Sequence, residues 1–391
     1  MRLAVICDYA EENWPSMDLV AEMLLKHLDA EHASLIEATR ICPPLSYRLS
    51  RVPSLRGKSF AFNADRLINR FRDYPRLLKR ERERFDLFHV VDHSYAHLVH
   101  ELPPERTVVT CHDLDTFRSV LEPQLEPRSR PFVTMTRRIL DGLRKAARVT
   151  CDSVATRDEL LKHELVPASR AVVIPNGVHP SCSPEPDASA DEEAARLLGV
   201  RKDEAIDLLH VGSTIQRKRI DVLLQVFAVV KREFPEARLV RAGGAFTEEQ
   251  ASTAGRLGLS EAIVVLPKLS RDVLAAVYRR AALVLQPSER EGFGLPVVEA
   301  LACGAPVVAS DLGVLREVGG EAAVYRSIAD ALAWSEAVIA LLYERRDDRQ
   351  AWEARRRAGL AQAAKFTWSE YANKMVALYR DLWYSRNSSN E

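Results

Sequence analysis

The segment 288–310, SEREGFGLPVVEALACGAPVVAS, decides the fold of this chain. Pro296 suits the first turn of a helix, where its missing N–H would have no intrahelical partner. Gly304 suits the left-handed position just past a helix end. The sequence therefore predicts a helix over residues 295–303 between two apolar strands, which is one strand–helix–strand step of a parallel sheet.

Two glycines and two glutamates surround the start of this predicted helix. Because Gly292 and Gly294 have no side chains, the N–H groups at the helix N-terminus can approach a phosphate or pyrophosphate. Glu291 lies just ahead of the helix and Glu299 one turn inside it, so we expect both carboxylates to point toward one opening. Carboxylates accept hydroxyl donors, which a sugar and a ribose beside a pyrophosphate would supply. Alternatively, Glu291 only complements the helix dipole and Glu299 is a solvated surface residue.

The complete stretch EGFGLPVVEALACGAPVVAS resembles the donor-site motif of the family-4 glycosyltransferases, two glutamates separated by seven residues. These retaining enzymes have the GT-B fold, an α/β architecture of two facing Rossmann-like, doubly wound domains. The resemblance implies that Glu291 binds hydroxyls of the transferred sugar and that Glu299 binds the ribose. The loop residues that it implies around the donor are Gly292, Phe293, Gly294 and Leu295.

The composition fits a globular chain of two domains. The 391 residues exceed one ordinary core, and 47% are hydrophobic and 28% charged. The formal net charge is zero, so we expect no nucleic-acid partner. Six scattered cysteines without a C-x-x-C pair indicate reduced thiols, and no metal-ligand cluster is evident. Without a long apolar run or a leader, we expect a cytoplasmic protein.

The order of elements predicts two domains and a returning helix. A buried strand over residues 3–7 opens the first domain, and a Pro- and Ser-rich linker over 180–186 follows its last strand. We expect an N-terminal acceptor-side Rossmann-like domain at 1–178 and a C-terminal nucleotide-sugar-binding Rossmann-like domain at 179–370. In the family the last helix crosses back to the first domain, which implies this role for residues 371–391.

The first turn of the chain departs from the family. There the family usually has a glycine-rich turn that approaches the donor phosphates, but residues 8–16 read DYAEENWPS and contain no glycine. The phosphate contacts of the first domain are therefore in doubt. Asn13, Trp14 and Ser16 are candidates for binding the acceptor instead, and packing over the first helix is the alternative for Trp14.

Two histidines follow predicted strands, at the edge where open α/β sheets bind ligands. His93 follows the strand at 85–91, and His112 directly follows the strand at 107–111. A lone histidine in such a place is more often a satisfied hydrogen-bonding residue. However, VVTCHDLDTF around His112 resembles the strand and loop whose histidine faces the transferred sugar in the family. The resemblance implies that role for His112, and His93 and Tyr95 are acceptor-side candidates.

Three cations gather in the turn GSTIQRKR at residues 212–219. They repel one another unless an anion shares the site, although a solvated turn is the alternative. The turn resembles the family's Gly-Arg…Arg-Lys-Gly loop, whose cations neutralise the donor diphosphate, and Lys218 matches its lysine. Ser213 stands where arginine is frequent and Arg219 where glycine is usual. One phosphate contact is therefore supplied by Arg217 or Arg219, or is absent.

A second glycine turn follows the next strand of the second domain. At Gly243 and Gly244 the backbone can approach a nucleotide closely, because no Cβ intervenes. In the family, backbone groups near the end of a later strand hold the base. That makes Pro267 and Lys268 candidates for contacting it.

Residues 48–84 form a basic segment with twelve Lys or Arg and four acids. Apolar residues are interspersed among these charges. Such a segment is often a solvated helix face, but it also suits anionic lipid or a phosphorylated acceptor. Membrane-associated acceptors are common in the family, so peripheral contact with the inner membrane face is retained as a hypothesis.

We therefore expect a retaining hexosyltransferase that uses a GDP- or UDP-sugar, with mannose as a first guess. Its acceptor would be a polysaccharide, glycolipid or other lipid-linked glycan. Expected catalytic residues are His112, Glu291 and Lys218, and Arg217 and N–H groups near Gly294 would stabilise the departing diphosphate. Alternatives are a catalytically silent GT-B subunit that binds a partner enzyme or membrane, and a GT-B phosphorylase or epimerase. The first strand lacks a following G-x-G-x-x-G, which excludes a dinucleotide-dependent oxidoreductase.

Overall fold

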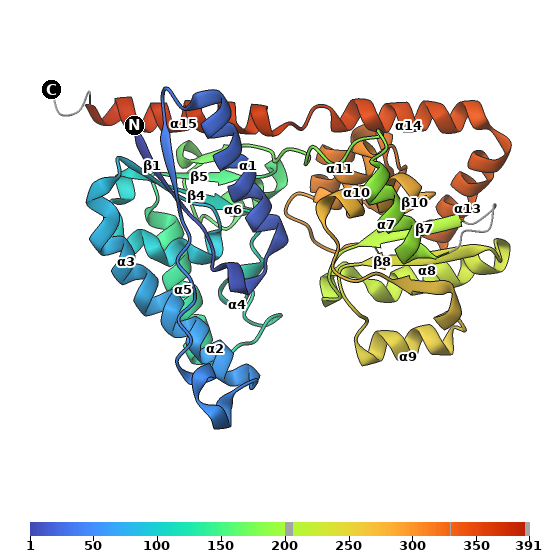
Figure 1. Ribbon diagram of the computed structural model, residues 1–391, viewed down its shortest axis with the longest axis horizontal. Coiled ribbons are helices and arrows are strands. Elements are labelled where there is room, and N and C mark those ends of the chain that lie inside the picture. Colours follow the sequence, from blue (N-terminus) through green and yellow to red (C-terminus); the bar gives the residue numbers. More distant parts are fainter. Residues whose placement is uncertain (200–205, 329, 388–391) are drawn as a thin grey trace. The chain divides into compact units, whose positions relative to one another are not determined.

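The computed structural model describes residues 1–199, 206–328 and 330–387. It divides the chain into two compact units, which are treated separately below (Figure 1). Unit 1 contains residues 1–177 together with the C-terminal helix that begins at Trp368. Unit 2 runs from Val178 to Thr367.

Unit 1 is built on a six-stranded parallel sheet with the strand order β2-β1-β3-β4-β5-β6. The central strands are buried along their length, as in parallel sheets that are covered on both faces. The order reverses between β1 and β3, which makes the carboxyl ends of these strands the switch point where α/β sheets bind ligands. The strands are β1 Arg2–Ile6, β2 Glu37–Ile41, β3 Leu87–Val90, β4 Thr107–Cys111, β5 Arg148–Cys151 and β6 Ala171–Val173.

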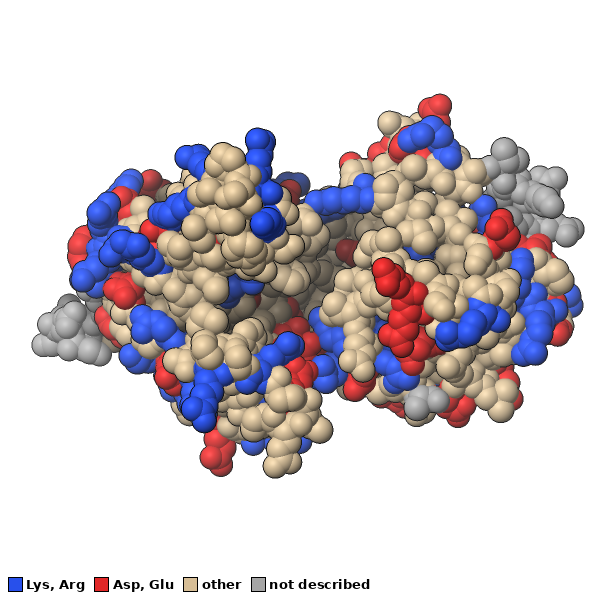
Figure 2. Space-filling model, turned by 90° about the horizontal axis from the view of Figure 1, so that it is seen from below, with Lys and Arg blue, Asp and Glu red and all other residues tan. Residues whose placement is uncertain are grey.

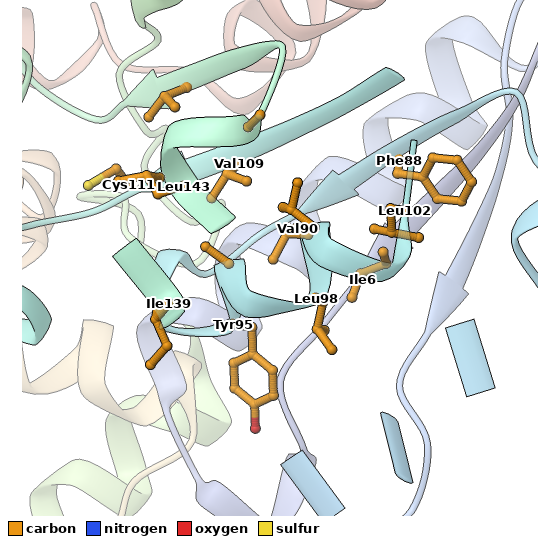
Figure 3. Close-up of a cluster of buried hydrophobic side chains, with 14 of the residues drawn as sticks. Ile6, Phe88, Val90, Tyr95, Leu98, Leu102, Val109, Cys111, Ile139 and Leu143 are labelled. Carbon is orange, nitrogen blue, oxygen red and sulfur yellow. The ribbon is translucent and has the colours of Figure 1, made fainter. Parts of the chain in front are cut away.

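Helices cover the sheet of unit 1. Figure 3 shows part of the resulting core, in which Val90 and Val109 of the strands lie near Leu98 and Leu143. Helix α5 approaches the 3-10 helix at His93–Glu101 so closely that a Cβ at its Gly142 would lie 1.9 Å from the carbonyl oxygen of Ala96. The helices are α1 Pro15–His32, α2 Ser59–Ile68, α3 Tyr74–Glu81, α4 Arg118–Leu121, α5 Arg130–Lys145, α6 Val154–Lys162 and α15 Trp368–Asn387.

Unit 2 has a second six-stranded parallel sheet, with the order β12-β11-β10-β7-β8-β9. This is the doubly wound order of nucleotide-binding folds, and its switch point lies between β7 and β10. The strands are β7 Ile206–Val211, β8 Ala237–Ala242, β9 Ile263–Val265, β10 Leu283–Gln286, β11 Val307–Ser310 and β12 Val324–Arg326. The helices are α7 Ala188–Leu198, α8 Ile220–Glu233, α9 Glu248–Arg256, α10 Arg271–Arg280, α11 Leu295–Ala302, α12 Gly313–Gly319, α13 Ala331–Asp347 and α14 Arg349–Ala363.

The helix of the opening segment lies close to its predicted bounds. The helix predicted at 295–303 is α11, which ends one residue earlier. Helix α4 is a single turn in which Arg118 is held by Glu122. Helix α7 was not predicted. Its N-cap Asp187, whose carboxylate accepts from the N–H of Ala190, was the available signal.

The C-terminal helix α15 is part of unit 1. It packs against α1, where the Ser369 hydroxyl donates to the carboxylate of Glu31 at 2.7 Å. Buried aromatic residues such as Tyr371 and Tyr379 lie along it, and the Tyr379 hydroxyl bonds to His89 of β3 at 2.7 Å. These contacts explain why a helix so late in the sequence completes the first fold.

The basic segment folds into α2, a π-helical turn at Asn69–Asp73 and α3. Its acids are used internally, since the buried carboxylate of Asp65 accepts from the N–H groups of Leu49 and Ser50 at 2.8 and 2.9 Å. Across the part of the chain that the structure describes, no helix is long and apolar enough to cross a membrane.

Candidate functional site

The switch point of unit 2 brings two predicted loops together. Strands β7 and β10 are paired neighbours, so the loop after each emerges at the same edge of the sheet. The loop 212–219 follows β7 and the loop 287–294 follows β10. They are tied directly, because the N–H of Glu289 donates to the carbonyl of Arg217 at 2.7 Å.

Lys218 and Glu291 meet at this edge. The Lys218 ammonium donates to Glu291 Oε1 at 2.6 Å, and Arg217 Nη1 lies 3.6 Å from Oε2. The side chains of Lys218 and Glu291 are 10% and 7% exposed. Burial acts to raise the pKa of Glu291, but the charges of Lys218 and Arg217 outweigh it and hold that pKa below its usual range. Three of the predicted site residues thus form one charged cluster.

Gln286 completes this cluster and was not predicted. It ends β10, is fully buried, and donates from Nε2 to Glu291 Oε1 at 2.6 Å and to Ser288 Oγ at 3.1 Å. Its Oε1 has no hydrogen-bond partner. The available signal was a polar residue at the end of the apolar strand LVLQ, because buried polar groups need partners.

The glycine turn ahead of α11 leads directly into the helix. Gly294 is the N-cap in the left-handed conformation, with φ of 93°, and a Cβ there would lie 2.6 Å from a methyl group of Leu315. Phe293 is buried and meets the ring of Phe366 edge-on, with the ring centroids 5.7 Å apart. Gly292 and Leu295 are half-buried on either side. The first turn of α11 therefore begins beside Glu291.

Glu299 lies inside α11 and contacts a different element from Glu291. The hydroxyl of Tyr278, on α10, donates to Glu299 Oε2 at 3.0 Å. Burial raises the pKa of Glu299 to about 7, against a smaller opposing effect of this hydrogen bond. The two glutamates of the motif therefore differ, since one is held ionised by cations and the other titrates near neutral pH.

The carboxyl ends of β7 and β8 approach closely at their glycines. A Cβ on Gly243 would lie 2.3 Å from the carbonyl oxygen of Gly212, so only glycine fits there without displacement. Ser213 is exposed in the same turn. Arg219 adopts a left-handed conformation and binds Asp221 at 2.9 Å, so of the two candidates for the second cation it is Arg217 that reaches Glu291.

In unit 1, His112 is buried and engaged by two acceptors. Its Nδ1 bonds to Asp152 Oδ2 at 2.6 Å and its Nε2 to the carbonyl of Val91 at 2.7 Å. Since both partners only accept, both ring nitrogens donate and the ring is a cation. Burial would lower the pKa of His112, but Asp152 raises it to about 10. His93 lies next to it, and its Nδ1 accepts from the backbone N–H of His112 at 3.3 Å.

The first turn of unit 1 carries buried acidic side chains in place of glycine. Asp8 is 5% exposed, and burial together with the nearby charge of Asp92 raises its pKa to about 9. Glu12 pairs with Arg66 at 3.0 Å and Arg70 at 3.8 Å. Packing of the side chain, the alternative considered for Trp14, does not hold, because that residue is 52% exposed.

The cysteines are all free thiols, four of them buried. Among residues 1–199, 206–328 and 330–387, no group of three or more His, Cys, Asp or Glu could hold a metal ion. The candidate sites among the described residues are therefore the polar groups at the carboxyl edges of the two sheets.

Sequence comparison matches both halves of the chain to glycosyltransferase families. The family described as "Glycosyltransferase Family 4" matches residues 19–181, and "Glycosyl transferases group 1" matches residues 192–358. With the two doubly wound sheets, these matches define the class. The chain belongs to the family-4 glycosyltransferases of GT-B fold.

Individual relatives agree with this class. The chain is 36% identical over 199 residues to the D-inositol 3-phosphate glycosyltransferase of Segniliparus rotundus, a match that covers 49% of this chain and 43% of that protein. The chain thus spans about half the length of the curated relatives that it matches first. Among solved structures, sucrose-phosphate synthase from Thermosynechococcus elongatus has a TM-score of 0.72 at 20% identity, covering 98% of this chain and 100% of that one. Anabaena HepE in complex with UDP and glucose has a TM-score of 0.71 at 16% identity, covering 97% and 100%. These structural likenesses concern the fold alone.

Proposed function

We propose that this protein is a glycosyltransferase that moves a hexose from a nucleoside diphosphate sugar to a hydroxyl of a glycan or lipid-linked acceptor, with retention of the anomeric configuration. The observation that carries this proposal is the contact of Lys218 and Arg217 with Glu291 beside the first turn of α11. Cations and helix N–H groups suit a diphosphate, and the carboxylate suits sugar hydroxyls.

Departure of the nucleoside diphosphate is the demanding step of such a transfer. Lys218, Arg217 and the N–H groups after Gly294 would stabilise the charge that builds on the leaving phosphate. A well-placed donor of this kind contributes about 3 to 4 kcal/mol to the transition state. From α11, Glu299 would accept the ribose hydroxyls, with Tyr278 holding its carboxylate in place.

Retention is what the resemblance to the family implies, and the contacts of Glu291 bear on the route by which it would occur. Both of its carboxylate oxygens are engaged, by Lys218, Arg217 and Gln286, which makes the carboxylate a poor nucleophile for double displacement. We therefore propose attack of the acceptor on the face from which the diphosphate departs. In that reaction the acceptor oxygen bonds to the anomeric carbon, the bond to the phosphate oxygen breaks, and the departing phosphate takes the acceptor proton.

The identity of both substrates belongs to this proposal. Mannose from GDP-mannose is the first guess from the sequence, and UDP-glucose is the second donor to test because HepE was solved with it. Acceptors to test are those of polysaccharide and glycolipid assembly, and also an inositol phosphate, which the names of the relatives suggest.

Unit 1 would contribute His112 to recognition of the transferred sugar. The resemblance in its VVTCHDLDTF setting supports this role, and the pairing with Asp152 supports a fixed, cationic imidazole. Because both ring nitrogens already donate to Asp152 and to the carbonyl of Val91, the role would be electrostatic, and the cation would favour the negative charge that develops on the departing phosphate.

Contact with an anionic membrane is a further part of the proposal. Between residues 49 and 64 the basic segment has three cations and no acid. In this stretch Val52 and Phe60 are 41% and 57% exposed. Figure 2 shows unit 1 from below, with Lys and Arg frequent on its surface. Cosedimentation with vesicles of phosphatidylglycerol but not of phosphatidylcholine would support the contact, and equal sedimentation with both would count against it.

A silent GT-B subunit is the second candidate. It is favoured by the first turn, in which Asp8 and Glu12 stand where a glycine-rich approach to phosphate was expected. The carboxylate of Glu12 at that place does not assist binding of a diphosphate.

The deciding experiment is incubation of the full chain with UDP-glucose or GDP-mannose and a panel of acceptors, followed by NMR of the products. The proposal predicts release of the nucleoside diphosphate and a new glycoside with the donor's anomeric configuration. An inverted glycoside would contradict the retaining mechanism. A sugar phosphate or an epimerised donor would identify a phosphorylase or epimerase, and nucleotide binding without turnover would favour the silent subunit.

A further inference from the structure

A buried arginine lies beneath the glycine turns of unit 2. Arg241 is on β8, directly across from His210 of β7, and both side chains are fully buried. Arg241 Nη1 donates to His210 Nδ1 at 2.9 Å. The histidine is therefore the acceptor and is neutral, because its pKa lies well below the usual value owing to burial and then to the charges of Arg241 and Lys218.

The other contacts of this guanidinium are also uncharged. Nη2 donates to the carbonyl of Gly212 at 3.1 Å and to that of Gly244 at 3.4 Å, and the ring of Phe246 lies 5.4 Å away. Among the residues that the structure describes, Nε has no hydrogen-bond partner. Within the described parts of the chain, no carboxylate pairs with Arg241. Burial lowers its pKa to about 10, so it is still a cation at neutral pH.

These contacts fix the direction of the two turns. Because the carbonyls of Gly212 and Gly244 point to the buried guanidinium, and C=O and N–H are opposed across a trans peptide, the N–H groups of Ser213 and Ala245 point away from it. Both residues are exposed. The turns thus present N–H groups on their outer side with a positive charge behind them.

The side chain of Lys218 lies beside the Gly212 turn as well. A Cβ on Gly212 would lie 3.5 Å from the side-chain carbons of Lys218 and 3.2 Å from the ring of His210, so these side chains surround one glycine. The charge of Lys218 is balanced by Glu291, whereas that of Arg241 is not. An uncompensated cation in a dry interior is costly unless an anion comes to lie nearby.

We propose that Arg241 is a positioning residue for the donor diphosphate, which orients the Gly212 and Gly244 turns and supplies from beneath the positive charge that the resemblance implies at position 213, where this chain has serine. This inference rests on the proposed function. It accounts for Ser213, whose side chain carries no charge at that position of the turn.

The test compares a charge-retaining with a neutral variant. Arg241→Lys keeps the charge, whereas Arg241→Gln keeps donors for the turns without it. Affinity is measured by calorimetry for the nucleoside diphosphate that binds the wild type and for its nucleoside. Arg241→Gln should weaken binding of the diphosphate about tenfold to hundredfold, as for a lost charge-assisted contact, and leave the nucleoside unchanged. Arg241→Lys should lose less, and Ser213→Arg in the Arg241→Gln background should restore part of the loss.

Equal losses of affinity for both ligands, or no loss, would overturn the inference. An arginine that only stabilises the fold would not affect binding of the diphosphate more than binding of the nucleoside. If Arg241→Gln fails to fold, Arg241→Lys carries the test. It should weaken binding of the diphosphate and leave that of the nucleoside unchanged, and an equal loss for both ligands, or no loss, would overturn the inference. If the wild type binds no nucleoside diphosphate, the proposed function fails. Inorganic pyrophosphate then replaces it as the probe, and the inference stands only if pyrophosphate stabilises the wild type more than Arg241→Gln.

Discussion

The carboxyl edges of the two sheets differ in chemistry although both sheets are parallel and doubly wound. In unit 2, glycine turns and the cations Lys218 and Arg241 surround the switch point. In unit 1, the corresponding turn has no glycine and buries the carboxyl of Asp8, with the cation His112 held by Asp152. The fold therefore decides where ligands can approach, and the residues at the strand ends decide what approaches.

Loss of the Lys218 ammonium should have the largest effect on this contrast. Lys218→Ala removes the cation nearest Glu291, so we expect affinity for a nucleoside diphosphate and turnover to fall together, turnover by about 10²–10³-fold. Arg219→Ala is the matched control from the same loop, because its guanidinium binds Asp221 instead. Calorimetry and initial rates measure both. Equal effects of the two variants would show that the loop acts only through its net charge.

Substitution of His112 should leave the unit 2 edge intact. His112→Ala is expected to cut turnover by about 10- to 100-fold, the usual range for a charged hydrogen-bonding group, with unchanged affinity for the nucleoside diphosphate. His100→Ala, a half-buried histidine of the same unit, is the control. Full activity of His112→Ala would show that His112 of unit 1 takes no part in the reaction.

Asp152→Asn sharpens this test. Asp152 raises the pKa of His112 to about 10, so its neutralisation should lower that pKa. The cationic ring would then be lost as the pH rises through a lower value than in the wild type. A pH–rate profile whose alkaline limb moves to lower pH supports a cationic role of His112, whereas an unmoved limb contradicts it.

The two glycines after β8 provide a smaller, matched comparison. Gly243 and Gly244 have φ of 122° and 110°, so alanine strains the backbone at both. Only at Gly243 does a Cβ also meet the carbonyl oxygen of Gly212. Gly243→Ala should therefore unfold at a lower urea concentration than Gly244→Ala. Its free energy of unfolding should be smaller by about 1–3 kcal/mol, the usual cost of overpacking. If the two variants are equally stable, the close approach of β7 and β8 is not a constraint.

The smallest expected effect is the pH dependence at Glu299. Its pKa is about 7, against 4.5 for the ordinary carboxyl group, so the contribution of Glu299 to stability is complete below about pH 4.5 and is lost as the pH rises through 7. Ribose binding requires the ionised carboxylate, so the affinity for the ligand should increase as the pH rises, whereas the contribution to stability decreases. Affinity for the nucleoside diphosphate should fall a few-fold between pH 8 and pH 6, as protonation near a pKa of 7 requires. Glu299→Gln should abolish this dependence, and its persistence would exclude Glu299 as the cause.

The two edges also differed in how far the sequence predicted them. Pro296 and Gly304 have local backbone requirements, so α11 could be placed within one residue. Lys218 and Glu291 stood in motifs, and their contact follows from the pairing of β7 with β10. In unit 2, prediction worked because local chemistry and topology agree.

Other groups could not be predicted, because their partners come from distant segments. Arg241 lies within an apolar strand that carries no signal for its contacts, and its burial depends on His210 and on two glycine carbonyls. The pairing of His112 with Asp152 joins residues at the ends of two neighbouring strands. Helix α4 begins at a residue held by charges that lie up to 41 positions away. Such contacts follow from the register of the sheets and not from sequence patterns.

The central claim is that the edge of unit 2 binds a nucleoside diphosphate. The most direct measurement is calorimetric titration of the full chain with UDP and GDP, beside uridine and guanosine. A diphosphate that engages Lys218 and the helix N-terminus should bind at least about tenfold more tightly than its nucleoside, since each charge-assisted contact is worth that much. Equal affinity of a diphosphate and its nucleoside, or no binding of either by the folded protein, would contradict the account.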